Sequence, residues 1–263
     1  MIKDACFLTV RLCLSDIKGL FFFVCFVLFC FVLFCCCFLS MMEEVNFDPR
    51  LCVPFSCMIV GPSGCGKTFF VKRLLENCEH VMDSVPDNIV WIYTSFQPMY
   101  DELKKMNKNI KFVEGLPDSF EDENLFPPDQ THLIILDDVI FQASDHPEVV
   151  KIFTQYRHHR NMSVMMLTQN VFHQGKYSRT ISLNSNYLIL FKNPRDKLQI
   201  SVLAQQIFPS QKPFFLESFE DATNAPHAYL LVDLTPSCPE QYRLRSGVLP
   251  HQWPTVYLPK TKF

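Results

Sequence analysis

Eight consecutive residues have the types and spacing of a phosphate-binding loop. They are Gly61, Pro62, Ser63, Gly64, Cys65, Gly66, Lys67 and Thr68, and they match the pattern G-x-x-x-x-G-K-[ST]. Glycines let the backbone curl so that successive N–H groups face phosphate oxygens. The lysine gives positive charge to the β- and γ-phosphates, and the threonine gives a hydroxyl for Mg²⁺. We therefore expect these residues to bind ATP with Mg²⁺.

A pair of carboxylates follows an apolar run later in the chain. Leu133 to Leu136 is apolar throughout, and Asp137 and Asp138 come directly after it. This order fits a buried parallel strand whose C-terminal end presents a carboxylate. We expect Asp137 to hold Mg²⁺, the Walker-B role. Asp138 is then the residue that would orient and deprotonate the attacking water.

A polar amide follows a further apolar run. Met162 to Leu167 is largely apolar and is followed by Thr168, Gln169 and Asn170. An amide at the end of a strand beside the phosphate-binding loop can sense the γ-phosphate or position the water. We assign that role to Gln169, with Thr168 or Asn170 in support.

Basic residues precede and follow the same predicted strand. Arg157 and Arg160 lie at its opposite end, far from the chain's own nucleotide but accessible to a neighbouring subunit. An arginine finger supplied in trans accelerates hydrolysis by roughly 10³–10⁵, so one of the two is a catalytic candidate. The loop from Phe172 to Arg179 mixes aromatic and basic residues, and Lys176 and Arg179 are candidate contacts to a DNA backbone. The same composition also suits an ordinary surface loop.

Strands and helices alternate from residue 55 onward, which predicts an α/β fold with a mostly parallel sheet and helices on both faces. A strand and its helix lie between the phosphate-binding loop and Asp137, as in the additional-strand (RecA-like) type of P-loop NTPase. The stretch 115–130 is rich in proline and acids and reads as a loop. We expect strands at 56–60, 88–94, 110–113, 133–136, 163–168, 186–191 and 228–234, and helices at 67–78, 99–106, 147–158 and 195–208.

The first 40 residues differ from the rest. Leu20 to Leu39 contains only Phe, Val, Leu and Cys, and a helix of that length spans roughly 30 Å, like a bilayer core. Basic residues before the run would send the P-loop domain across the membrane. We therefore favour a misassigned start, with Met41 as the alternative start, over a membrane anchor. The predicted organisation is this segment at 1–40, a P-loop ATPase domain at 41–235 and a proline-rich tail at 236–263.

Charge and cysteine content narrow the functional classes. The 263-residue chain has a formal net charge of −3, which is not the basic footprint of a dedicated DNA-binding domain. Any contact with DNA must come from a local patch. The 12 cysteines contain no C-x-x-C pair, which argues against a zinc site or disulfide framework and suits a reducing compartment.

The ordered set of motifs over residues 50–235 resembles the genome-packaging ATPases of large DNA viruses. These are the poxvirus-type group of the FtsK/HerA superfamily, and a similar set occurs in Maverick/Polinton transposons. The matching pieces are the run Gly61–Thr68, Leu136-Asp137-Asp138, Arg157-His158-His159-Arg160 before a strand that ends in Leu167-Thr168-Gln169-Asn170, and Lys192-Asn193-Pro194-Arg195-Asp196.

The resemblance implies a RecA-like core in a homo-oligomeric ring, expected as a hexamer, that uses ATP to move double-stranded DNA into a capsid. Capsid protein would be a further partner, and the location would be intracellular, in cytoplasm or nucleus. The wider superfamily usually has Glu where this chain has Asp138. By position, Lys67 and Thr68 bind phosphate and Mg²⁺, Asp137 the metal, Asp138 stands for the hydrolytic acid, Gln169 for the sensor, and Arg157 or Arg160 for the finger.

Three other functions remain open at this point. A P-loop kinase or another DNA-independent ATPase would share the phosphate-binding loop. A membrane-anchored nucleotide-binding protein would need residues 20–39 as a real anchor. A domesticated transposon copy would keep the fold as a structural partner. A GTPase is disfavoured, because Asn107-Lys108-Asn109-Ile110 lacks the final Asp of the guanine-reading motif.

Overall fold

The structure is a computed structural model, and it describes residues 47–259 apart from 107–108, 140–142 and 144. The predictions for residues 1–40, including the apolar run at 20–39, lie outside these described residues. Within them, none of the helices combines the length and the apolar character that a membrane crossing requires.

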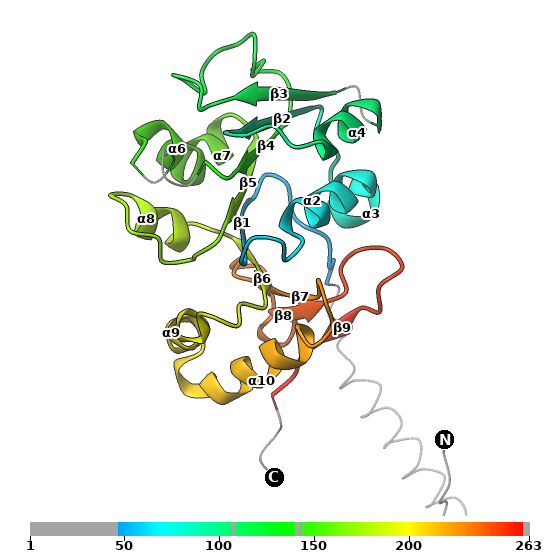
Figure 1. The fold of residues 1–263 in the computed structure, drawn as a ribbon, viewed down its shortest axis with the longest axis vertical. Coiled ribbons are helices and arrows are strands. Elements are labelled where there is room, and N and C mark those ends of the chain that lie inside the picture. The colour runs from blue at the N-terminus through cyan, green and yellow to red at the C-terminus, as the bar shows by residue number, and fades with distance from the viewer. Residues whose placement is uncertain (1–46, 107–108, 140–142, 144, 260–263) are drawn as a thin grey trace, which may run out of the picture. The chain divides into compact units, whose positions relative to one another are not determined.

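Nine strands of the described chain form one mixed sheet (Figure 1). They are β1 (Ser56–Val60), β2 (Asn88–Tyr93), β3 (Ile110–Glu114), β4 (His132–Asp137), β5 (Met162–Thr168), β6 (Tyr187–Phe191), β7 (Tyr229–Asp233), β8 (Leu244–Ser246) and β9 (Thr255–Val256).

The sheet order is β3-β2-β4-β5-β1-β6-β7-β8-β9. Neighbouring strands from β3 to β6 are parallel, and those from β6 to β9 are antiparallel. The strand β5 lies between β1 and β4, which is the arrangement expected of the additional-strand type. The predicted α/β class with a mostly parallel sheet is therefore confirmed.

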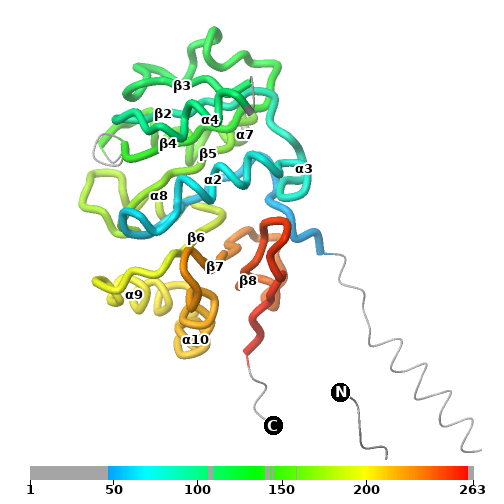
Figure 2. Tube along the Cα trace, turned by 45° about the vertical axis from the view of Figure 1, so that its right-hand side comes forward, coloured from blue at the N-terminus to red at the C-terminus, as the bar shows by residue number. Residues whose placement is uncertain are grey.

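Helices cover both faces of the sheet. Figure 1 shows α2, α3 and α4 on one side of the strands and α6, α7, α8 and α9 on the other. Figure 2 shows α9 and α10 together below β6 and β7. The bounds are α2 (Lys67–Glu76), α3 (Cys78–Val81), α4 (Met99–Met106), α6 (Pro147–Lys151), the π-helical turn η1 (Ile152–Tyr156), α7 (Arg157–His159), α8 (Ser178–Leu183), α9 (Lys197–Ile207), the 3₁₀ turn η2 (Pro209–Gln211), α10 (Lys212–Ala222) and the 3₁₀ turn η3 (Glu240–Tyr242).

Each face of the sheet has its own apolar core. Successive residues of a strand point to opposite faces, so Cys57 and Ile59 of β1 join the core under α2 to α4. Met58 and Val60 join the core under η1, α8, α9 and α10. Every residue of β1 is buried, as expected for a parallel strand covered on both sides. The strand that leads into the phosphate-binding loop is therefore held firmly from both faces.

Several elements differ from the sequence-based expectation. The helix expected at 147–158 is present, but its middle is the π-helical turn η1. The loop expected at 172–179 ends in the helix α8, and α10 was not expected. Residues from 236 on, expected as a proline-rich tail, add β8 and β9 to the sheet. These two strands have three and two residues, too few to give a periodic pattern.

Candidate functional site

The phosphate-binding loop joins the end of β1 to the start of α2, as its sequence predicts. Gly66 has a φ of 106° directly before the helix begins at Lys67, a conformation that L side chains rarely adopt. A Cβ atom at Gly61 would lie 2.7 Å from the Cβ of Phe191 on β6. Since that distance is a clash, the loop passes β6 with no room for a side chain. The glycines are therefore required by this particular backbone path.

The Lys67 side chain is folded over the loop and is 8 % exposed. Its ammonium donates hydrogen bonds to the carbonyl oxygens of Gly61, at 2.7 Å, and Pro62, at 3.1 Å. The positive charge is thereby held beside the N-terminal end of α2, which adds its own partial positive charge. Thr68 lies in the first turn of the same helix and is half-buried. Together these groups form an anion-binding site at the N-terminal end of α2.

Asp137 is the last residue of β4 and is 3 % exposed. Its Oδ2 accepts a hydrogen bond of 2.9 Å from the hydroxyl of Tyr100 on α4. Burial raises the pKa of Asp137 to about 6; the Tyr100 bond and the positive charge of Lys67 oppose that rise, and the charge of Asp138 adds to it. Because β4, β5 and β1 are adjacent and parallel, Asp137 and the phosphate-binding loop lie at the same end of the sheet, and the two sequence motifs belong to one site.

Asp138 lies just past the end of β4 with an exposed side chain. Its φ is 55°, in the left-handed region where Asp and Asn occur more often than other side chains. Its carbonyl oxygen accepts a hydrogen bond from the Thr94 hydroxyl at 3.4 Å. Among the described residues its carboxylate forms no hydrogen bond, so the group is available to a ligand.

The end of β5 lies directly beside the phosphate-binding loop. The Gly61 N–H donates to the Thr168 carbonyl at 3.1 Å, and Val60 pairs with Thr168 in the sheet. Thr168 is buried, and its hydroxyl exchanges hydrogen bonds with the backbone of Asn170. That exchange fixes the turn that carries Gln169, whose side chain is exposed. The structure thus places Gln169 at the same edge as Lys67, Asp137 and Asp138.

The residues present fit a magnesium ion. Mg²⁺ prefers hard oxygen ligands such as carboxylate and hydroxyl groups, and Asp137 and Thr68 offer one of each. Tyr100 occupies Oδ2 of Asp137, while Oδ1 forms no hydrogen bond within the described chain, although the buried indole N–H of Trp91 also lowers the pKa of this carboxyl. Asp137 therefore keeps one carboxylate oxygen for a cation or its water shell.

Arg157 and Arg160 lie at the opposite, amino-terminal edge of the sheet. The Arg157 guanidinium donates to the side-chain oxygen of Asn186, which also accepts from the Ser56 hydroxyl at 3.0 Å. Arg157 is half-buried, and this burial lowers the pKa of its guanidinium. Arg160 donates to the Phe120 carbonyl at 3.3 Å. Neither side chain is placed beside the phosphate-binding loop of its own chain.

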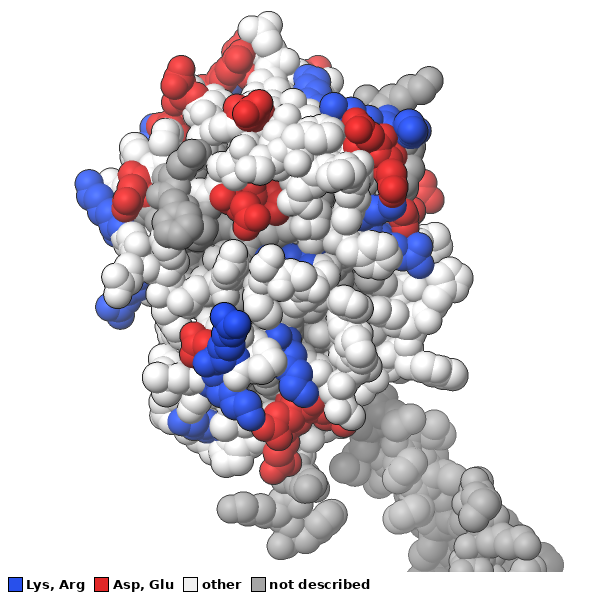
Figure 3. Space-filling view, in the orientation of Figure 1, with Lys and Arg blue, Asp and Glu red and all other residues white. Residues whose placement is uncertain are grey.

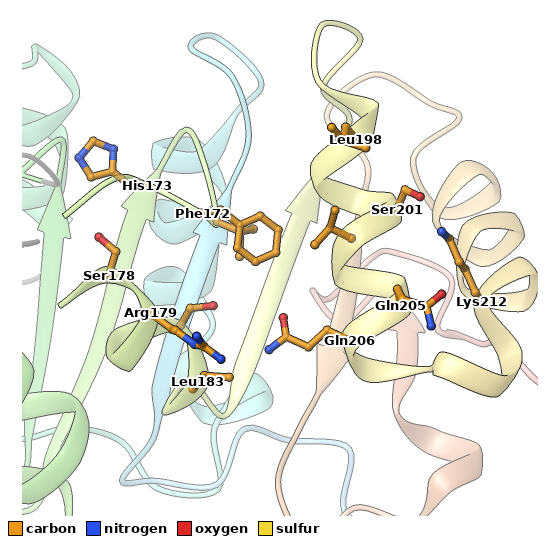
Figure 4. Close-up of a pocket in the computed structure, with 13 residues that line it drawn as sticks. Phe172, His173, Ser178, Arg179, Leu183, Leu198, Ser201, Gln205, Gln206 and Lys212 are labelled. Atoms are coloured by element: carbon orange, nitrogen blue, oxygen red, sulfur yellow. The ribbon is translucent and has the colours of Figure 1, made fainter. Parts of the chain in front are cut away.

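The predicted DNA loop divides into two environments. The Lys176 ammonium lies 4.9 Å from the centre of the Tyr177 ring, and its backbone N–H donates to Asp145. Arg179 belongs to α8 and lines a groove of about 700 Å³ between α8 and α9 (Figure 4). Exposed apolar side chains such as Phe172 and Leu198 line the same groove. Of the two basic residues, Arg179 lines this groove, whereas Lys176 is not among its lining residues.

Sequence analysis missed a histidine that contacts the phosphate-binding loop. The Nδ1 atom of His227, in the connection from α10 to β7, donates to the Cys65 carbonyl at 3.0 Å. Two hollows of about 420 and 330 Å³ flank this contact. The first lies among Phe69, the His227 connection and the loop before β9, and the second reaches Lys192. No local signal marks His227, because the contact spans 162 residues.

No protein-family model and no curated protein matches the sequence. Among solved structures, the chain is similar to the genome packaging NTPase B204 from Sulfolobus turreted icosahedral virus 2, with a TM-score of 0.49 and 12 % identity over 82 % of this chain and 99 % of that one.

Two further similarities are to the DNA-packaging ATPase B204 from Sulfolobus turreted icosahedral virus and to the N-terminal domain of zonular occludens toxin from Neisseria meningitidis. The first has a TM-score of 0.47 and 13 % identity over 79 % of this chain and 99 % of that one. The second has a TM-score of 0.35 and 16 % identity over 55 % and 80 %. At these identities, the residues at the carboxyl edge of the sheet carry the functional inference.

Proposed function

We propose that this protein hydrolyses ATP and uses the energy to move double-stranded DNA, as a packaging motor that fills a capsid. One observation carries the ATPase part of this proposal. Lys67, Asp137, Asp138 and Gln169 come from three neighbouring strands or their connections, and all lie at one edge of the sheet. Ligands of open α/β sheets bind at the carboxyl ends of the strands.

The residues divide the work of hydrolysis between them. The backbone of the phosphate-binding loop and Lys67 bind the phosphates, and Thr68 and Asp137 would hold Mg²⁺. The ion, when bound, neutralises charge that develops on the transferred phosphoryl group. Asp138 takes the proton of the attacking water. Gln169 orients that water from the neighbouring strand.

For the arginine finger we favour Arg160 over Arg157. Arg157 is half-buried and donates to the Asn186 side chain within its own chain, so its release would cost a charge-assisted hydrogen bond. Within the described residues, the Arg160 side chain forms one hydrogen bond, of 3.3 Å, to the Phe120 carbonyl. In a ring, this edge would face the nucleotide of a neighbouring subunit, and capsid protein would be the partner outside the ring.

For DNA we consider two basic surfaces. One contains Lys176 and Arg179, as the sequence suggests. The other follows β6, where Lys192, Arg195 and Lys197 are exposed at the same sheet edge as the phosphate-binding loop. Figure 3 shows Lys and Arg side chains gathered over the connection between β6 and α9. Removing a side chain that contacts a DNA phosphate makes DNA binding less dependent on salt concentration. Alanine variants of the set that contacts DNA should therefore show a shallower salt dependence, and alanine variants of the other set should not.

The first experiment is ATP turnover by the full chain with and without linear double-stranded DNA, with the oligomer mass followed in parallel. We expect DNA to stimulate turnover in a species of ring size. Turnover by a monomer that ignores DNA would overturn the motor and favour a kinase or another DNA-independent ATPase. A kinase transfers the phosphate to an acceptor, whereas an ATPase releases it to water. Measuring where the phosphate goes therefore distinguishes these two functions.

The trans role of Arg160 has its own test. Arg160→Ala should bind ATP but not hydrolyse it, and Lys67→Ala should not bind ATP. In mixed rings the Lys67→Ala subunit supplies an intact arginine to its neighbour, so turnover should return in part. Mixtures without any recovery would overturn the proposed trans finger.

A further inference from the structure

We infer that Tyr100 is a positioning residue for the carboxylate that would bind Mg²⁺, an inference that rests on the proposed ATPase function. Tyr100 is the second residue of α4 and is fully buried. Its hydroxyl donates to Oδ2 of Asp137 at 2.9 Å. The two residues come from different elements, so this bond connects α4 to the end of β4.

The position of this hydroxyl is set by packing around the Tyr100 ring. The ring centre lies 5.3 Å from that of Trp91 and 5.2 Å from that of Tyr93, both on β2. Phe96 and Phe112 complete the enclosure at 5.5 and 5.2 Å. A ring that is contacted on all these sides has little freedom to turn, so the hydroxyl is held in place before any ligand binds.

The bond to Tyr100 leaves the Asp137 carboxylate with a defined orientation. A phenol donates one proton, and an ionised carboxylate accepts through either oxygen. With Oδ2 engaged, rotation of the carboxylate about its last torsion would break the bond. Oδ1, with no hydrogen bond among the described residues, remains the oxygen for the cation. Mutation of a residue that contacts a metal-binding side chain, and not the metal itself, commonly lowers metal affinity by about 10–100-fold.

The helix that carries Tyr100 is also connected to the helix of the phosphate-binding loop. Lys72 of α2 forms an ion pair with Glu102 of α4. Lys72 lies one turn after Thr68, so α4 contacts both elements that would hold the ion. Because Glu102 is largely exposed, this ion pair contributes little stability, and the position of α4 is set mainly by its buried Tyr100 ring. The helix α4 thus contacts both the metal-binding carboxylate and the helix that carries the Thr68 hydroxyl.

The test compares Tyr100→Phe with Tyr187→Phe in the full chain. Tyr187, on β6, is also a buried tyrosine. Its hydroxyl accepts a hydrogen bond of 3.1 Å from the backbone N–H of Cys52. Each variant removes one buried hydroxyl and keeps the ring, so both should fold, and their thermal midpoints without metal should be similar. The readouts are Mn²⁺ binding in the presence of ADP, measured by electron paramagnetic resonance, and binding of a fluorescent ATP analogue in EDTA.

We expect Tyr100→Phe to weaken Mn²⁺ binding by about tenfold and to leave nucleotide binding in EDTA unchanged within about twofold. Tyr187→Phe should leave both unchanged. Turnover of Tyr100→Phe should recover as Mg²⁺ is raised, since the chemistry itself is intact. A purely structural hydroxyl would give equal Mn²⁺ affinities in the two variants, and that result would overturn the inference.

A double variant tests whether Tyr100 acts through Asp137, and thermal unfolding of each variant without metal checks that it is folded. If Tyr100 acts through Asp137, then Tyr100→Phe added to Asp137→Asn causes no further loss of Mn²⁺ affinity. A further loss in the double variant contradicts the inference. A wild-type chain that binds neither Mn²⁺ nor nucleotide would instead overturn the proposed function, and wild-type binding with normal affinity in Tyr100→Phe would overturn only the role of Tyr100.

Discussion

Polar side chains at the two edges of the sheet differ in their hydrogen bonding. At the amino-terminal edge, Arg157, Asn186 and Ser56 satisfy one another through hydrogen bonds within the chain. At the carboxyl-terminal edge, Asp138 and Gln169 are exposed, and neither side chain forms a hydrogen bond within the described structure. The first group serves the fold, because buried polar groups need partners. The second group is accessible to solvent and to a ligand.

The largest effect should come from Lys67, whose ammonium lies over the phosphate-binding loop. Lys67→Ala should weaken ATP binding at least about 100-fold and abolish turnover, because the phosphates lose their main cation. Titration with a fluorescent ATP analogue measures this. Lys72→Ala, on the same helix but paired with Glu102, is the matched control and should bind ATP within about twofold of the wild type. Equal losses in the two variants would contradict the assigned site.

Asp138→Asn should separate binding from chemistry. The amide cannot take a proton from water, so turnover should fall by about 10²–10⁴, while ATP binding stays the same. Asn also tolerates the left-handed backbone of this position, so the variant should keep its fold. Single-turnover measurement of phosphate release gives the rate. Wild-type turnover in this variant would mean that another group acts as the base.

The pH dependence of turnover should reflect Asp137. Burial raises the pKa of this carboxyl to about 6, and the ion requires its charged form. Turnover at limiting Mg²⁺ should therefore fall by about tenfold for each pH unit below that value. Stability should change in the opposite direction: the contribution of Asp137 is fully present below its unfolded pKa of 3.8 and is lost as pH rises through about 6. Asp137→Asn should remove the pH dependence of stability, which denaturant unfolding at several pH values measures.

At the other edge, a substitution should affect stability and leave nucleotide binding unchanged. Arg157→Ala removes the charged partner of Asn186, and the free energy of unfolding should fall by about 1–2 kcal/mol. Denaturant unfolding measures this loss. ATP affinity should stay at the wild-type value, because the side chain lies at the edge opposite the phosphate-binding loop. A change in ATP affinity larger than the change in stability would show that the two edges are coupled.

The smallest effect is expected from His227, which contacts the phosphate-binding loop from a distant segment. His227→Ala removes a single neutral hydrogen bond to Cys65, worth about 1 kcal/mol. The Kd for ATP should rise by about two- to fivefold. Isothermal titration of ATP analogues measures the change, and His251→Ala, in the loop before β9, is the control.

Local pattern was sufficient to predict most of the carboxyl edge. The strand before Gly61, the strand before Asp137 and the strand before Gln169 are apolar runs that end in polar residues, and parallel strands bring such ends together. Contacts between segments that are far apart in the sequence could not be predicted. Tyr100 meets Asp137 across 37 residues, and His227 meets Cys65 across 162. Such contacts depend on how α4 and the α10–β7 connection pack, which no residue spacing reveals.

Missed elements had different causes. The helix α10 contains Phe215, Phe219 and Ala222 on its buried side, and this helical spacing is a signal present in the sequence. The strands β8 and β9 are too short for any period and form only because β7 offers a free edge. One omission was therefore a matter of pattern reading, and the other of tertiary structure.

The left-handed backbone of Asp138 limits how this site can change over evolution. A single base change converts an Asp codon into a Glu codon, so mutation supplies that exchange readily. Glu, however, is not favoured at a positive φ, and Asp138 has a φ of 55°. An exchange to Glu would therefore be less favourable here than at a position with a negative φ. The backbone conformation therefore favours Asp over Glu at position 138, although mutation supplies Glu readily.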